Sequence, residues 1–550
     1  PSNYSAHRLL ADSYAALPGI EAARASELLQ AQLLQPINIT PVSPRMAETK
    51  LLIPSGGPIT SSLYEFNPLF VQDRPTLFFS GLGGDQGTWG DELVVSGLTQ
   101  QFSYSLGQFH YQSDGYRTNN DLENNLYNLF VQTAVMPDLN LQAEYRGRET
   151  ISGDQRSLFD GSFSTGIRRT VDQETARVGA RYSLSPQATA LASVIYTDRE
   201  GTLSSRTNDS NTRVRSKGTQ AEAQLLYKTE RFNVITGLGA YSLDATIDQP
   251  TTDSTQQIAY GYANIKIPDP VTWTIGLSYE SDEDPSANLN EINPKLGVRW
   301  AINDQVSLRA AAFKTVKRPF AFEQTIEPTQ VAGFNQLTDH IIMTVLKNYG
   351  AALDVRFNDR LWGGLEALKR DTDVPFGQLA VPEFYEIVSN REYFYSAYGY
   401  WLPNRNWALS ISPRYETFKA DRDCSLCLFL YPAELKTFSL PLNVRYFDPS
   451  GFFSGLGIVY VNQEIQAIDP RSSAPRSFTL TPTQDEEFTL VNISFGYRLP
   501  KRWGVVALQI NNVFDKNFHY QDNNYQTGDG TTNPLYIPER TLTGQLVLNF

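Results

Sequence analysis

Apolar and polar residues alternate along much of the chain. At its end, one face of the predicted strand carries Leu542, Gly544, Leu546, Leu548 and Phe550, while polar residues dominate the other face. A period of two residues is that of a β-strand with unlike environments on its two sides. A terminal aromatic residue on the apolar face, with no helix after it, predicts a strand that closes a larger sheet.

The same alternation recurs upstream. It is clearest over residues 139–146, 271–280 and 407–416, where every second residue is apolar and the residues between are polar or charged. A soluble sandwich shows this pattern too, so the connections between strands must decide between the two architectures.

Short and long connections alternate along the chain. Outer-membrane barrels have this asymmetry, with tight turns on the periplasmic side and long loops outside. Short turns are predicted at 99–100, 137–138, 185–186, 229–230, 268–270, 303–304, 358–359, 403–404, 448–449 and 500–501. With a first strand from Thr76 to Leu82, these turns predict an all-β transmembrane barrel of about 22 antiparallel strands over residues 76–550.

The N-terminal region has a different pattern. Apolar residues recur at helical spacing over residues 5–34, interrupted by Leu17-Pro18-Gly19, which predicts a helical hairpin in a segment 1–35. This hairpin resembles one tetratricopeptide (TPR) repeat, and an ordinary hairpin is the alternative. The positions that carry the resemblance are Leu10, Ala11, Tyr14, Ala23, Leu28, Ala31 and Pro36. Residues 36–75 are rich in Pro, Ser and Gly and predict an irregular linker.

Composition excludes several classes of protein. Mean hydropathy is −0.34, and the chain contains no apolar run long enough for a membrane-spanning helix. The net charge of −13, from 46 basic and 59 acidic residues, argues against nucleic-acid binding. We find no nucleophile with a base and an orienting group, so we expect no enzyme, no catalytic residues, no cofactor and no metal site.

The two cysteines lie in a predicted outward loop as Cys424-Ser-Leu-Cys427. This spacing also occurs in redox pairs and in half of a zinc site, but no second such pair of ligands completes a metal shell. We expect a structural disulfide between Cys424 and Cys427.

Tryptophan placement supports a membrane interface. Indole rings are favoured where one edge is apolar and the other is wet, so a belt of them at one interface is expected. The tryptophans near predicted short turns are Trp273, Trp300, Trp362, Trp401, Trp407 and Trp503. By alternation, the candidates for lining the lumen are Glu280, Arg299, Arg309, Arg414 and Glu416.

Several segments together resemble TonB-dependent outer-membrane receptors. Residues 81–84, 98–106 and 113–119 look like that family's first barrel strands, and 314–322 with 348–359 are similar to its mid-barrel pattern. Residues 508–518 and 538–541, with the terminal Phe550, look like its C-terminal pattern. The resemblance covers roughly residues 76–550 and implies a 22-stranded barrel in the outer membrane of a Gram-negative bacterium.

Members of that family carry an N-terminal globular plug, whereas about 75 residues precede the first predicted strand here. An empty barrel of this width would be a large aqueous hole. We therefore expect residues 36–75, with folded-in outer loops such as 316–343, to occupy the lumen or its periplasmic mouth. Because a lone repeat cannot bury its own apolar face, we also expect a periplasmic or membrane protein partner to bind through residues 1–75, besides outer-membrane lipid.

Three functions remain open at this point. The chain is a receptor-like barrel that moves or gates a solute, with its plug replaced or supplied by another chain. Alternatively, it is a porin for exopolysaccharide export, a class that also joins helical repeats to a barrel. In the third interpretation it is a membrane anchor that recruits a multiprotein assembly through its helical segment.

Overall fold

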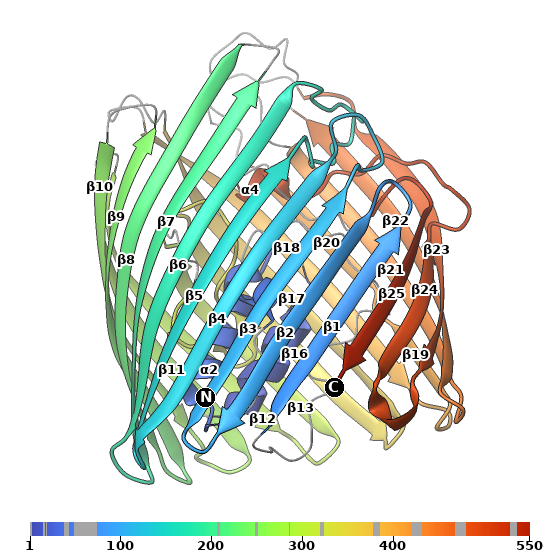
Figure 1. The fold of residues 1–550 in the computed structure, drawn as a ribbon. Helices are drawn as coiled ribbons and strands as arrows, with labels where there is room; N and C mark the ends of the chain where they lie inside the picture. The colour runs from blue at the N-terminus through green and yellow to red at the C-terminus, as the bar shows by residue number, and fades with distance from the viewer. Residues whose placement is uncertain are drawn as a thin grey trace.

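The computed structural model describes residues 3–14, 17, 19–37, 43–48, 74–205, 209–247, 251–284, 287–318, 324–377, 385–420, 432–467, 480–527 and 536–550. These residues form one antiparallel β-barrel with short helices inside it (Figure 1). The helices are α1 (Tyr4–Tyr14), α2 (Glu21–Leu34), α3 (Pro44–Ala47) and α4 (Asn524–Thr527), with a 3-10 turn at Pro500–Arg502. None of the described helices has the length and apolarity needed to cross a membrane.

The wall strands follow one another in sequence order around the barrel. They are β1 (Pro75–Gly84), β2 (Trp89–Thr99), β3 (Phe102–Ser113), β4 (Leu122–Met136), β5 (Leu139–Ser152), β6 (Ile167–Ser183), β7 (Ala188–Ser205), β8 (Ser210–Lys228), β9 (Phe232–Ile247), β10 (Thr251–Ile265), β11 (Val271–Asp284), β12 (Ala287–Ala301), β13 (Val306–Val316), β16 (Val345–Asn358), β17 (Leu361–Gly377), β18 (Tyr385–Trp401), β19 (Trp407–Ile411), β20 (Arg414–Ala420), β21 (Pro432–Phe447), β22 (Phe452–Ala467), β23 (Gln484–Arg498), β24 (Gly504–Asn511) and β25 (Thr541–Asn549). Strands β14 (Gln330–Val331) and β15 (Phe334–Asn335) form a second, two-stranded sheet.

The sheet has 23 assigned strands, but β19 and β20 both pair with β18 and β21. They are two parts of one strand that is interrupted next to Pro413, whose nitrogen cannot donate to a ladder. The wall therefore has 22 strands, as the turn pattern predicts. β1 pairs with β25, and Leu77 and Phe550 exchange backbone hydrogen bonds of 3.0 and 2.8 Å. The closing role predicted for the last strand is confirmed.

Each predicted short turn lies between two consecutive wall strands, all at the lower end of the barrel in Figure 1. The described parts of the long connections lie at the opposite end. The first strand is slightly longer than expected, because β1 begins at Pro75 and ends at Gly84. Both chain ends lie toward the short-turn side (Figure 1).

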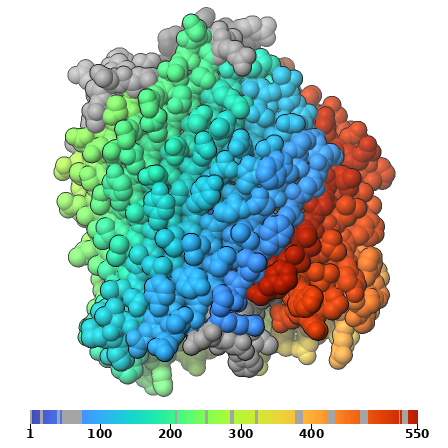
Figure 2. Space-filling model, viewed as in Figure 1, coloured from blue at the N-terminus to red at the C-terminus, as the bar shows by residue number. Residues whose placement is uncertain are grey.

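Side-chain exposure is inverted relative to a water-soluble sheet. On β11, Trp273, Ile275 and Leu277 are 40, 51 and 53% exposed, whereas Ser278 and Glu280 are 0 and 3% exposed. The apolar face points outward and the polar face points into the lumen. Figure 2 shows the resulting continuous outer wall, with the blue first strands beside the red last strands. Hydrocarbon is the environment that this outer surface fits.

This orientation predicts a depth-dependent cost for an outward charge. Leu277→Arg, in the middle of β11, should destabilise the folded barrel by roughly 2–4 kcal/mol, whereas Leu184→Arg, in a short turn and 54% exposed, should cost about 0–1 kcal/mol. Reversible denaturant unfolding in phospholipid vesicles measures both. Equal costs at the two sites would contradict a membrane-facing β11.

Candidate functional site

The lumen is the candidate functional site, and α2 lies inside it beside α1 (Figure 1). Helix α2 forms because Ala, Leu, Glu and Gln, which favour helices, fill residues 21–34. Nearly all of its residues are buried, including Glu27, Gln30 and Gln32. A helix that is buried on every side is enclosed by other parts of the protein.

The apolar side of α2 packs against the wall. Leu29, Leu33 and Leu34 belong to one buried cluster with the inward-facing Leu191 and Ile195 of β7. The same cluster includes Leu226, Ile235, Tyr241, Ile258, Tyr260 and Tyr262 of β8–β10, and Ile326. Burying a leucine side chain contributes about 1.5–3 kcal/mol. This patch of the wall holds the helix at a defined position in an otherwise polar lumen.

Polar contacts fix the C-terminal end of α2. Arg177 donates to the side chain of Gln32 at 3.0 Å, and Arg181 donates to the carbonyl of Leu34 at 2.7 Å. A Cβ added at Gly179 would approach a methyl of Leu33 to 2.6 Å, so the lack of a side chain there permits the close contact. Wall strand β6 is therefore shaped to receive the helix.

The short helix α3 is attached to the neighbouring part of the wall, strands β2–β5. Ser43 hydrogen-bonds to Glu92, and Arg45 pairs with the same carboxylate at 3.4 Å. Glu48 pairs with Arg146 at 3.3 Å and with Arg148 at 3.7 Å. Residues 43–48 therefore lie within the barrel, as expected for part of the linker. The remainder of the linker, 38–42 and 49–73, lies outside the described residues.

An outer loop also enters the lumen, as predicted for the connection 316–343. We call its described part, residues 324–344, the inner loop. Its hairpin β14–β15 places Val331 and Phe334 in a buried cluster with Ala311 and Phe313 of β13 and Ala352 of β16. A Cβ at Gly350 would approach the ring of Phe334 to 2.5 Å, so a wall glycine again admits an inserted side chain.

The inner loop caps α2. The carboxylate of Asp339 accepts hydrogen bonds from the amides of Glu21 at 2.8 Å and Ala22 at 3.0 Å. These are first-turn donors that have no partner within a helix. The preceding residue, Ile20, cannot supply a side-chain cap. The loop thus supplies the N-cap that the local sequence lacks.

Further hydrogen bonds join the two segments along the helix. The amide of Thr325 donates to the hydroxyl of Ser26 at 3.1 Å, and Gln30 donates to the carbonyl of Glu327 at 2.9 Å. Gln330 donates to the hydroxyl of Tyr14 at 2.6 Å. Helices α1 and α2 and the inner loop therefore form one folded unit within the barrel.

A buried group of charges lies where the inner loop meets the wall. Arg318 pairs with Glu327 and lies 3.8 Å from Glu280 and 4.0 Å from Glu222. Burial alone would lower the pKa of Arg318, but Tyr241, Glu280 and Glu222 outweigh it and raise the pKa above its usual value. The guanidinium remains charged. Losing either side of this group would leave a buried charge unpaired.

The last loop also folds toward the lumen from the outer end, through its described residues 512–527 and 536–540. Tyr525 packs against Phe418 of β20 with ring centroids 4.7 Å apart, and Phe518 stacks on Phe488 at 3.9 Å. The amide of Ile341 donates to the carbonyl of Gln526 at 3.0 Å. This contact joins the last loop to the inner loop, so the last loop reaches the inner loop from the long-loop end of the barrel.

The predicted lining residues have different surroundings. Glu280 is buried beside Arg318. Arg309 pairs with Asp354 at 2.9 Å and with Glu366 at 3.3 Å. Arg414 and Glu416 share the inner face of β20 with Phe418, which contacts Tyr525. That these residues line the path of a solute stays a prediction.

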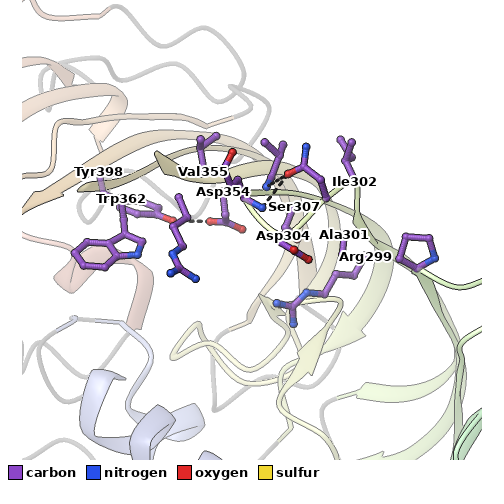
Figure 3. A pocket seen from close by; sticks show the side chains of 14 residues that line it. Arg299, Ala301, Ile302, Asp304, Ser307, Asp354, Val355, Trp362 and Tyr398 are labelled. Carbon is purple, nitrogen blue, oxygen red and sulfur yellow. Dashed lines mark hydrogen bonds between the residues drawn. The ribbon is translucent and has the colours of Figure 1, made fainter. Parts of the chain in front are cut away.

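The fifth residue, Arg299, lines a cavity of about 550 Å³ at the short-turn end of the lumen (Figure 3). Trp362 lines the same cavity, so it faces inward and does not extend an outward belt. Its position on β17 is out of phase with the exposed Leu365. The other predicted belt residues, Trp273, Trp300, Trp401, Trp407 and Trp503, are 40–53% exposed. Their contact with lipid stays a prediction.

Two further expectations concern ligands and partners. Cys424 and Cys427 lie outside the described residues, and no group of three His, Cys, Asp or Glu in the described part of the chain could hold a metal ion.

The apolar side of the hairpin, expected to bind a partner protein, is covered by the barrel wall and the inner loop. Sequence showed that this face must be buried but not that the same chain would bury it.

Solved structures share this fold. The FrpB iron transporter from Neisseria meningitidis is 12% identical, with a TM-score of 0.66 over 87% of this chain and 82% of that one. The copper transporter OprC is 13% identical, with a TM-score of 0.63 over 87 and 83%. The ferripyoverdine receptor of the Pseudomonas aeruginosa outer membrane, bound to ferripyoverdine, is 13% identical, with a TM-score of 0.63 over 87 and 72%.

A family model also matches the sequence. The model described as TonB dependent receptor-like, beta-barrel matches residues 60–339. A search of curated protein sequences found no match.

The cap from Asp339 predicts a local effect on α2. Asp339→Ala should speed amide exchange in the first turn of α2 by about 2- to 30-fold, because an N-cap contributes roughly 0.5–2 kcal/mol. Asp339→Asn retains an acceptor and should change exchange much less. Hydrogen exchange of the folded protein, followed by mass spectrometry of peptides from residues 19–34, measures the effect. Identical exchange in both variants would contradict the cap.

Proposed function

Because the chain belongs to the TonB-dependent receptor-like β-barrel family, whose members lie in the bacterial outer membrane, we propose that it transports a solute through a lumen gated by its own N-terminal helices and inner loop. The members of this family and the structures that resemble the chain are transporters, not enzymes. The neighbours carry iron, copper or ferripyoverdine according to their names. A metal ion or a metal complex is the proposed cargo.

The burial of α2 inside a closed 22-stranded wall carries this proposal. A wall of this size encloses a lumen that needs a plug. The described residues of 3–37, residues 43–48 and the inner loop provide apolar, hydrogen-bonded and charged contacts to the wall, on β2–β10, β13 and β16. These segments therefore act as the gate, and solute passage requires them to move or leave.

The contacts suggest how the gate responds to an outside ligand. The last loop meets the inner loop at Gln526 and Ile341, and the inner loop caps α2 through Asp339. A ligand that binds the outer loops more tightly in a displaced arrangement would weaken the hold on α2. A periplasmic partner that binds residues 1–75 would act on the same helices from the other side, and its identity stays a proposal.

This proposal predicts that the N-terminal segment blocks ion flow. In planar bilayers, the full chain should conduct little, and a variant that lacks residues 1–48 should show a large increase in single-channel conductance. A synthetic peptide of residues 3–48, added to the truncated barrel, should restore the block. This peptide distinguishes a removed gate from a damaged wall.

Equal conductance with and without residues 1–48 would contradict gating by this segment. Asp339→Ala in the full chain offers a milder second variant. It should increase the frequency of brief openings, because it weakens the contact between the inner loop and α2 while leaving the wall intact. Asp138→Ala, in a short turn of the wall, is the matched control.

A further inference from the structure

The cavity beside Arg299 has the size of a ligand site. Its volume of about 550 Å³ falls within the usual range of roughly 300–1,000 Å³ for small-molecule pockets. It lies at the short-turn end of β12, β13, β16 and β17, and the turn 302–305 forms one side. This is the periplasmic mouth of the lumen, the end opposite to the long outer loops.

The cationic groups around this cavity differ in their pairing. Arg309 pairs with Asp354 and Glu366, and Arg356 pairs with Asp359. Arg299 stands directly opposite Arg309 in the strand register, yet its guanidinium has no ion pair or hydrogen bond among the described residues. An exposed guanidinium beside a second arginine favours an anionic group that accepts hydrogen bonds from its two parallel N–H groups.

The rest of the lining includes the apolar surface of Trp362 and two residues with hydroxyl groups, Tyr398 and Ser307. Figure 3 shows Trp362 and Arg299 on opposite sides of the cavity, with Asp354 between them. The hydroxyl of Tyr398 donates to Asp354 at 2.7 Å, so this hydroxyl already has a partner. Ser307 is also among the residues around the cavity, and its hydroxyl oxygen is buried away from solvent without a hydrogen-bond partner.

We propose that this cavity binds a small monocarboxylate with an apolar or aromatic body. Arg299 holds the carboxylate, and Trp362 packs against the body. The nearby carboxylates of Asp304 and Asp354 repel a second negative charge, so dicarboxylates and phosphate dianions fit poorly. The cavity is a binding site at the short-turn end of the lumen, separate from the contacts that hold α2.

This inference uses the proposed function only for the assignment of the short-turn end to the periplasm. The site itself depends on the geometry of the wall and not on movement of α2. A failed conductance experiment would therefore overturn the gate and leave the binding site in place, whereas failed binding would overturn the site alone.

Binding is tested with benzoate, titrated into the purified full chain in detergent micelles and measured by isothermal calorimetry. Benzyl alcohol and benzylamine share the ring but replace the carboxylate with a neutral or cationic group. Benzoate should bind at least about tenfold more tightly than either analogue, because only the carboxylate makes the charged contact with Arg299. Absence of benzoate binding, or equal binding of benzyl alcohol, would overturn the proposal.

Three variants locate the site. Arg299→Gln should weaken benzoate binding by about tenfold or more, while Asp304→Asn should strengthen it by removing a repelling charge. Arg231→Gln makes the same charge change in an exposed turn at this end of the barrel but away from the cavity, and should leave affinity unchanged. Far-ultraviolet circular dichroism confirms folding. Unchanged affinity in both cavity variants would assign the bound benzoate to another place and refute this site.

Discussion

The structure depends on one constraint: hydrocarbon offers no hydrogen bonds, so each backbone amide and carbonyl in the membrane must find a partner within the sheet. Closure of β1 on β25 removes the last two open edges. The outward side chains must then be apolar, and the polar half of each strand has only the lumen to face. A water-filled interior would suit those residues equally well, so the wall alone does not explain why this barrel is filled.

The filling is explained by features that interrupt the polar lining. An apolar patch on β7–β10 accepts the leucines of α2, and wall glycines accept Leu33 and Phe334. Charged residues such as Arg177 and Glu48 find partners across the boundary between wall and filling. In an open pore the apolar members of this set, such as Leu191 and Ile195, would face water. The wall and its contents are therefore complementary surfaces, and the lumen resembles a protein interior more than a channel.

Sequence predicted the wall well because its signal is local and repeated. Alternation on β11 identifies both faces, and turn residues such as Pro137-Asp138 mark where consecutive strands reverse. The helical spacing around Leu28 and Leu29 likewise predicts a buried helical face.

What buries this face could not be predicted from the sequence, because the contact joins distant segments. One signal was present: the inner face of β7 carries Leu191 and Ile195 where other strands carry polar residues, which indicates an inner contact. Trp362 was assigned by its closeness to a turn, whereas its phase relative to Leu365 indicates an inward direction. Sequence could not show that Arg299 is unpaired. This depends on Arg309 forming the ion pairs with Asp354 and Glu366, which only the three-dimensional structure shows.

The pairing of Phe550 with Leu77 joins the first and the last strand of the wall, so the seam closes only when every strand between them is in place. Helices α1 and α2 have no closed lumen to occupy before that pairing forms. They then have to be enclosed while the two edge strands approach, since a sealed cylinder would admit α1, α2 and the inner loop only through its ends. Biogenesis thus joins insertion of the wall and packing of its contents into a single event.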